Sequence, residues 1–398
     1  MSRGAGTPGR REDVMDDLIR EIRGKVQSRH REILASLEEV VSINSYSRNY
    51  EGINFAGELV RKNMPESLHH QITTDRNGVN HHLFSTGVEQ VGLNLVLLGH
   101  VDTVFPPESE SRRYEETTDR IFGAGITDMK AGVVVIIHAL RILDEMGLLS
   151  SIPIKCLING DEEIGSTHSR PMIKELAKWA SFGLVFEGGG RGGEVVYARR
   201  GIRRFKLTVT GEAQHAGVWE GPKASAILEL ARMVQSLEAL NDREGGISLN
   251  VGKISGGTTT NVIPDLATAS FEYRFWDGDA EKKTLSRINE IVKNPENPMT
   301  GATVNCHHHR PAGCPLEGTE ELYDMVSKTA LELGQKVEKE RRGGTSDANF
   351  LVDGGVPTLD GMGPSGALDH SSEECIIRDS LFERTELLAL LMARQFKV

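Results

Sequence analysis

Apolar residues recur at steps of three and four between positions 13 and 41, which is the spacing that one face of an amphipathic helix requires. Farther along, residues 95–98 form a continuous apolar run, residues 133–149 have the length of a helix, and residues 152–158 form another apolar run. This alternation predicts a β-α-β arrangement in which the strands are buried inside a sheet.

Polar residues stand where these predicted strands end. His100 follows the first apolar run, the acidic residues 161–163 follow the second, and Glu187 lies at a similar point farther along the chain. Functional groups in such sheets collect at the carboxyl ends of the strands. We therefore expect these side chains to converge.

The pattern changes near Gly201 and predicts a separate set of elements: strands at 205–210, 249–254 and 267–275, and helices at 224–240 and 282–292. A chain of 398 residues is too long for one hydrophobic core and suits two domains. We predict a discontinuous catalytic domain at 12–199 and 313–398, an inserted unit at 200–312, and a disordered tail at 1–11. Helices predicted at 320–333 and 379–395 return the chain to the first domain.

Net charge and cysteine usage narrow the choice of partners. The formal net charge of −11 opposes binding to a nucleic-acid backbone or to an anionic membrane surface. We interpret the four arginines within 199–204 as a hinge flanked by solvated charge, and we expect no nucleic-acid partner. The longest apolar run, 387–393, is far shorter than the ~20 residues of a membrane helix. The four cysteines form no CxxC pair, which favours the reducing cytoplasm. We therefore predict a soluble cytoplasmic protein whose negative charge favours small substrates over nucleic acid.

Five residues have the character of metal ligands, and most of them stand in loops after apolar runs. They are His100, Asp128, Glu163, Glu187 and His370. A borderline divalent ion such as zinc accepts this mixture of imidazole and carboxylate, and a carboxylate can bridge two ions with its two oxygens. The sequence therefore predicts a metal centre, with Asp128 as the natural bridge.

Two further carboxylates support this centre. Asp102 is offset from His100 by two residues on extended chain, so both side chains point the same way and Asp102 can accept the other ring N–H of His100. Glu162 and Glu163 are adjacent carboxylates after a buried strand, which is costly unless a cation or a proton compensates their repulsion. We assign Glu163 to the metal and Glu162 to proton transfer. A solvated acidic loop remains the alternative for this pair taken alone.

Five motifs recur together in order: GHVDTVFP (99–106), GAGITDMKAG (123–132), NGDEEIGS (159–166), FEGG (186–189) and GALDHSSEE (366–374). With them the chain, from about position 32 onward, resembles the M20 family of metallopeptidases, and most closely its glutamate carboxypeptidases of the carboxypeptidase G2 type. The resemblance implies two zinc ions, for which Co²⁺ or Mn²⁺ could substitute. His100 and Glu187 would hold one ion, Glu163 and His370 the other, and Asp128 would bridge them, with Glu162 as the catalytic base.

The resemblance also implies a fold. The expected class is α/β, with a mixed-sheet catalytic domain of the zinc aminopeptidase/phosphorylase-hydrolase type and an inserted α+β ferredoxin-like lid that makes a homodimer. It implies a cis peptide bond between Asp128 and Met129, and it places the TSDANF loop (345–350) near the metals, where it would shape the specificity pocket.

Three residues of the lid match positions that act on substrate in the family. His215, in GEAQHAG (211–217), would cross to the partner's active site and stabilise the developing oxyanion, although Gln214 replaces the serine that usually precedes it. Asn261 and Arg310 would bind the α-carboxylate of the substrate. A planar guanidinium suits a carboxylate.

These features predict a di-zinc amidohydrolase that releases a C-terminal amino acid, glutamate, from a small molecule or short peptide with a free carboxylate. An N-acyl-amino-acid deacylase of the acetylornithine deacetylase/succinyl-diaminopimelate desuccinylase type uses much the same groups and remains an alternative. A non-catalytic metal-dependent binding protein is a third interpretation. The sequence argues against it because all six metal and base positions carry competent residues.

Overall fold

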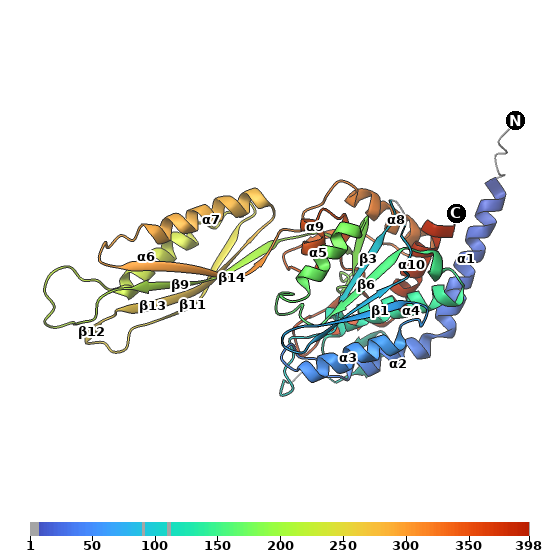
Figure 1. The fold of residues 1–398 in the computed structure, drawn as a ribbon, viewed down its shortest axis with the longest axis horizontal. Helices are drawn as coiled ribbons and strands as arrows, with labels where there is room; N and C mark the ends of the chain where they lie inside the picture. Colours follow the sequence, from blue (N-terminus) through green and yellow to red (C-terminus); the bar gives the residue numbers. More distant parts are fainter. Residues whose placement is uncertain (1–7, 90–91, 110–112, 398) are drawn as a thin grey trace. The chain divides into compact units, whose positions relative to one another are not determined.

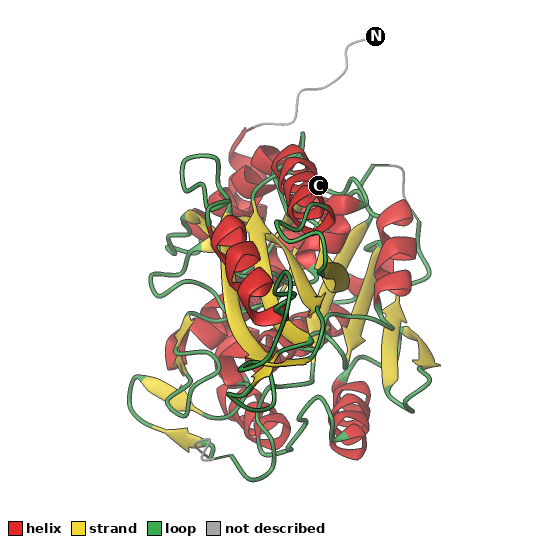
Figure 2. Ribbon diagram, turned by 90° about the vertical axis from the view of Figure 1, so that its left-hand side faces the viewer, coloured by secondary structure: helices red, strands yellow, loops and turns green. Residues whose placement is uncertain are grey.

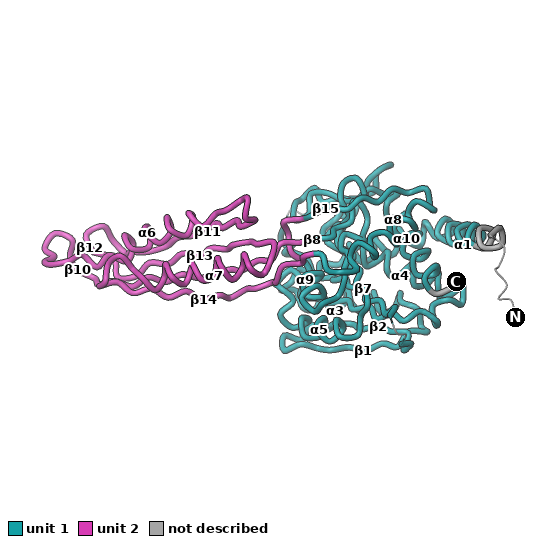
Figure 3. Tube along the Cα trace, turned by 90° about the horizontal axis from the view of Figure 1, so that it is seen from above, with its two compact units in different colours: residues 1–198, 315–341, 346–398 teal, residues 199–314, 342–345 magenta. Residues whose placement is uncertain are grey.

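The computed structural model describes residues 8–89, 92–109 and 113–397, and the chain divides into two compact units (Figure 3). The first unit holds residues 1–198, 315–341 and 346–398, and the second holds 199–314 and 342–345. Residues 342–345 are predicted to belong to the catalytic domain, but they cluster with the second unit. Hydrogen bonds to their backbone carbonyls explain this: Arg342 O accepts from Arg200 N, and Gly343 O accepts from the Arg274 side chain.

A mixed six-stranded sheet forms the centre of the first unit (Figure 1). Its strands, in spatial order, are β1 (His69–Thr74), β2 (Asn80–Ser85), β6 (Ile154–Asn159), β3 (Leu95–His100), β7 (Phe182–Val185) and β16 (Thr358–Leu359). The four strands from β6 to β16 run parallel, and β1 and β2 pair antiparallel at one edge. This arrangement confirms the predicted α/β class with a mixed sheet.

Helices cover both faces of this sheet (Figure 2). Alternate residues of β3 point to opposite sides: Leu95 and Leu97 join the larger core, while Val96 and Leu98 join the smaller one. The larger core contains residues of α1 (Pro8–Ser28), α2 (His30–Val41), α3 (Tyr50–Asn63), α4 (Ala131–Glu145), α8 (Thr319–Glu332) and α10 (Arg378–Lys397), and the smaller contains residues of α5 (Arg170–Trp179) and α9 (Ala348–Asp353). The continuous apolar runs of β3 and β6 follow from burial on both faces.

The amino-terminal prediction was wrong in part. The predicted tail covered residues 1–11, but α1 begins at Pro8, and residues 1–7 lie outside the described part of the chain. Proline is well suited to the first turn of a helix because its missing N–H would have no helical partner there. The helix predicted from residue 13 is also broken at Arg29, which separates α1 from α2.

The second unit is a four-stranded antiparallel sheet with two helices. Its strands, in spatial order, are β11 (Ser248–Gly256), β13 (Leu266–Phe275), β9 (Gly201–Thr210) and β14 (Gly301–Arg310). The helices α6 (Ala226–Glu238) and α7 (Gly278–Lys293) pack on one face and close a core around Phe205, Leu207 and Tyr273. This is the α+β unit that the sequence predicts.

The remaining elements are short. They are β4 (Glu115–Glu116), β5 (Arg120–Phe122), β8 (Val195–Arg199), β10 (Gln214–His215), β12 (Val262–Ile263), β15 (Lys339–Arg342), β17 (Gly366–Ala367) and β18 (Cys375–Ile377), with one turn of 3₁₀ helix at Leu149–Ser151. Strands β17, β18, β5 and β4 form a small antiparallel sheet in the first unit. None of the described helices is long and apolar enough to span a bilayer.

Candidate metal centre

The five predicted ligands come together in the first unit. His100 ends β3, Glu163 and Glu187 lie in the loops after β6 and β7, Asp128 lies in the turn Ile126–Lys130 that leads into α4, and His370 lies between β17 and β18. The parallel strands β6, β3 and β7 are neighbours in the sheet, so their carboxyl ends bring three of these ligands to one edge.

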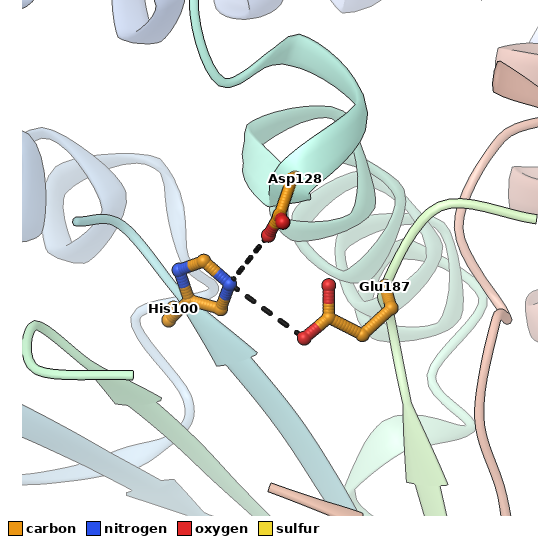
Figure 4. Close-up of side chains that lie close together, drawn as sticks. All are labelled: His100, Asp128 and Glu187. Atoms are coloured by element: carbon orange, nitrogen blue, oxygen red, sulfur yellow. Dashed lines mark hydrogen bonds and ion pairs between the residues drawn. The ribbon is translucent and has the colours of Figure 1, made fainter. Parts of the chain in front are cut away.

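One cluster is formed by His100, Asp128 and Glu187 (Figure 4). The Nε2 atom of His100 lies 2.9 Å from Asp128 Oδ1 and 3.7 Å from Glu187 Oε1. His100 is almost completely buried. One imidazole nitrogen therefore faces two carboxylates from different segments.

A second cluster shares Asp128 with the first. His370 Nε2 lies 3.1 Å from Asp128 Oδ2 and 3.5 Å from Glu163 Oε2. Asp128 thus presents one carboxylate oxygen to each histidine. The ligand atoms of each cluster all lie within 4.8 Å of one another.

The ionisation of these groups reflects a crowded, buried set of carboxylates. Burial, together with the charge of Asp128, raises the pKa of Glu163 to about 8 and that of Glu187 to about 8. Burial alone would lower the pKa of His100, but the neighbouring carboxylates hold it well above its usual value. Hydrogen bonds to Asp128 and Glu163 raise the pKa of His370 to about 11. The surrounding carboxylates therefore favour positive charge at this centre.

These residues fit a pair of divalent cations. Each cluster offers one imidazole and one terminal carboxylate, and the shared Asp128 has an oxygen for each ion. Glu163 Oε1 is buried and has no hydrogen-bond partner among the described residues. A buried carboxylate oxygen without a partner is costly, and a cation would satisfy it.

Asp102 has contacts on both sides of the candidate centre. His100 Nδ1 lies 3.0 Å from the backbone carbonyl of Asp102 and 3.5 Å from its carboxylate Oδ1. The carboxylate also accepts the backbone N–H groups of Glu162 and Glu163, at 3.0 and 3.1 Å, and the hydroxyl of Ser47. Asp102 thus fixes the turn that carries the candidate base, and Glu162 lies beside a ligand of the second cluster.

Two supporting carboxylates were not assigned from the sequence. Glu374 accepts the backbone N–H groups of Gly125, Thr127 and Asp128, and so holds the turn that presents the shared ligand. Glu374 is the last residue of the GALDHSSEE motif, so the motif could have marked it as a candidate. Nothing in the sequence, however, indicated which backbone N–H groups it would bind. The peptide bond between Asp128 and Met129 is cis, as predicted.

Asp347, in the TSDANF loop, holds the other turn. Its carboxylate accepts from the side chains of Asn159 and Ser166, which mark the two ends of the turn that contains Glu162 and Glu163. Asp347 is buried, and its two hydrogen bonds hold both ends of the turn in place from inside the protein.

The three remaining candidate residues belong to the second unit. His215 and Asn261 are brought together, since β10 pairs with β12 and Ala216 N donates to Asn261 O at 2.8 Å. Both side chains are exposed. Arg310 is buried at the opposite end of the sheet, where it pairs with Ile202 of β9, whereas His215 follows Thr210, the last residue of that strand. The structure therefore separates Arg310 from the other two within this unit.

The first unit is an α/β unit whose sequence is interrupted by the α+β unit, and it holds two ligand clusters that share one carboxylate. This combination is typical of two-domain metallohydrolases. The family model "Peptidase family M20/M25/M40" matches residues 96–394. The chain belongs to the M20 family, and it is a hydrolase.

Carboxypeptidase G2 of Pseudomonas sp. (strain RS-16) is 30% identical over 350 residues, which cover 86% of this chain and 83% of that protein. The succinyl-diaminopimelate desuccinylase of Ehrlichia canis (strain Jake) is 25% identical over 362 residues, covering 82% and 92% respectively. Among solved structures, the Bacillus subtilis YXEP protein, a dinuclear metal binding peptidase from the M20 family, matches with a TM-score of 0.69 at 14% identity, over 93% of this chain and 99% of that one.

Proposed function

We propose that this hydrolase binds two zinc ions and releases a C-terminal amino acid, glutamate, from an amide. The observation that carries the proposal is the pair of ligand clusters that share Asp128, with Glu162 on the same turn as the ligand Glu163. When bound, two such ions lower the pKa of an attacking water and polarise the amide carbonyl. The similarity to carboxypeptidase G2 supports the carboxypeptidase assignment.

The side chains of this protein have distinct roles in the proposed reaction. Glu162 takes a proton from the attacking water and delivers it to the departing amino group, which needs a carboxylate held within reach of both. Asp102 holds Glu162 in place through the backbone. His215 donates a hydrogen bond to the developing oxyanion, and Asn261 and Arg310 bind the carboxylate of the released amino acid.

The positions of these last residues support a homodimer. Arg310 pairs with Ile202 near the start of β9, whereas His215 follows Thr210 at the end of that strand. The eight steps from Ile202 to Thr210 span about 26 Å of extended chain at ~3.3 Å per residue. One second unit cannot place both on one small substrate, so we propose that His215 and Asn261 act in the site of a partner subunit.

An unpaired sheet edge supports such a dimer. β11 is an edge strand, and Ile254 on it is exposed, as are Ile227 and Leu228 of the adjacent α6. An exposed edge with apolar side chains favours association. Light scattering after size exclusion should give twice the chain mass, and a monomer at all concentrations would contradict the proposal.

The decisive experiment compares the wild type with Glu162→Gln. The panel contains N-acyl-glutamates, folyl-glutamates and dipeptides with added zinc, and amino-acid release is measured with ninhydrin. We expect the variant to keep its metal and lose on the order of 10²–10⁴-fold in turnover, because proton transfer contributes that much. Near-normal activity would exclude Glu162 as the base.

The same panel tests the second candidate function, an N-acyl-amino-acid deacylase, which the succinyl-diaminopimelate desuccinylase relatives favour. Release of glutamate from several acyl partners supports a carboxypeptidase, whereas preference for one simple acyl group indicates a deacylase. No release from any substrate would favour a non-catalytic binding protein. We further propose a cytoplasmic location, supported by the four cysteines, all of which are free thiols.

A further inference from the structure

A hollow of about 290 Å³ lies in the first unit, over the small sheet of β17, β18 and β5. Its floor is formed by residues 366–368 and 375–377, and Arg120 and Arg191 contribute the only charged side chains among the residues that line it. Both guanidinium groups belong to residues that solvent reaches. Two cations therefore face one concave surface.

Neither cation is strongly compensated by the protein. Arg191 makes no hydrogen bond or ion pair within the part of the chain that the structure describes. The Nε atom of Arg120 lies 3.8 Å from Asp119 Oδ2, but both side chains are more than half exposed, and such pairs contribute little. The guanidinium group of Arg120 also lies 3.9 Å from the sulfur of Cys375. The hollow thus offers positive charge that an anion could use.

The walls of the hollow are built from the segments that carry the metal ligands. Leu368 lies two residues before His370. Thr127, the neighbour of Asp128, packs so closely on Gly366 that a Cβ added there would lie 2.5 Å from Thr127 Cγ2. Arg191 follows the ligand Glu187 by four residues. The hollow and the candidate metal centre are therefore built in part from the same segments of the chain.

We propose that this hollow binds a second carboxylate, at the far end of the acyl group of the substrate. The inference rests on the proposed function and narrows it to amides whose acyl part is a dicarboxylic acid or an acidic residue. A guanidinium recognises a carboxylate through paired hydrogen bonds, and Arg120 and Arg191 supply two such groups. At ~30 Å³ for each water displaced, the volume has room for a four-carbon acyl chain.

The first test measures kcat/KM for a matched pair of substrates, N-succinyl-glutamate and its neutral isostere N-succinamoyl-glutamate. The wild type should prefer the succinyl compound by about ten-fold or more, which is the value of one charged hydrogen-bonded pair. Arg191→Gln and Arg120→Gln should each lower this ratio toward one. The matched control is Arg31→Gln, since Arg31 is exposed on α2 and is not one of the residues that line the hollow, and it should leave the ratio unchanged.

A binding measurement makes the result independent of turnover. Calorimetric titration of the metal-loaded protein with succinate and with succinamate should give tighter binding of succinate. The difference should be lost in Arg191→Gln and Arg120→Gln and kept in Arg31→Gln. Equal affinities in the wild type, or a difference that survives both substitutions, would overturn the proposal. If inorganic phosphate binds more tightly than succinate, and this binding also depends on the two arginines, the hollow is a site for a small inorganic anion and the proposal is overturned.

The two experiments separate this inference from the proposed function. Cleavage of amides without any effect of the arginines would leave the hydrolase assignment standing and reject the carboxylate site. An arginine-dependent preference for succinate in a protein that cleaves no amide would support the site and reject the proposed function.

Discussion

The two units hold their functional side chains in opposite ways. In the first unit, His100, Asp102 and Glu162 are buried, and the turns that carry the ligands are fixed by carboxylates from distant parts of the chain. In the second unit, His215 is exposed, and its ring Nδ1 accepts a hydrogen bond from Gly217 N, two residues away in the same loop. The candidate metal centre is thus held in place by the fold itself, whereas His215 belongs to a surface whose proposed role needs a partner subunit.

The largest effect should come from removing the ligand that both clusters share. Asp128→Ala should lose both metal ions and all measurable activity, because each cluster is left with one imidazole and one carboxylate. Glu187→Ala is the matched control and should lose one ion, since Glu187 belongs to a single cluster. Plasma mass spectrometry after gel filtration measures the metal content. Equal losses in the two variants would contradict a shared ligand.

His215→Ala should lower kcat by about 10²–10³-fold, as the loss of one oxyanion donor does in other enzymes. The melting temperature should not change, because the side chain is exposed. Mixing and reassociating this variant with Glu162→Gln should restore about a quarter of the wild-type rate, since half of the dimers are then mixed and each of these has one complete site. A mixture as inactive as its components would show that His215 does not act across subunits.

A smaller effect is expected from Asp347→Asn, which tests how firmly the first unit fixes its catalytic turn. The amide group faces two donors, Asn159 Nδ2 and Ser166 Oγ, so one buried donor loses its partner, at a cost of about 1–3 kcal/mol. Chemical denaturation should show this loss of unfolding free energy, and kcat should fall more than KM rises. Asp353→Asn, an exposed change close by in the chain, should alter neither quantity.

The smallest effect should come from Ser47→Ala, which removes one of the hydrogen bonds to Asp102 but leaves the two backbone donors in place. A loss of about 1 kcal/mol in unfolding free energy is expected, with activity within a few-fold of the wild type. A loss of activity as large as that of Glu162→Gln would mean that Asp102 is not held by the backbone of the catalytic turn.

Much of the fold could be predicted because the relevant signals are local. The buried strands β3 and β6 appear as apolar runs, and α4, α6 and α10 appear as periodic or apolar segments of helical length. Strand β14 was missed because most of its residues are exposed or only partly buried and three consecutive positions, 307–309, are histidines. Edge strands have few buried neighbours, so their sequences carry little pattern.

The sequence by itself determined which residues have the chemistry of metal ligands and that most of them follow buried segments. Both properties depend only on the residue types and on their near neighbours in the chain. Only the tertiary structure decided that Asp128 faces both histidines and that Asp102 holds the backbone of 162–163. It also decided that Arg310 pairs with one end of β9, whereas His215 lies in the separate β10–β12 pair, after the other end of β9. These facts depend on register and on contacts between segments up to hundreds of residues apart, and no local pattern specifies which distant donor a buried carboxylate will meet.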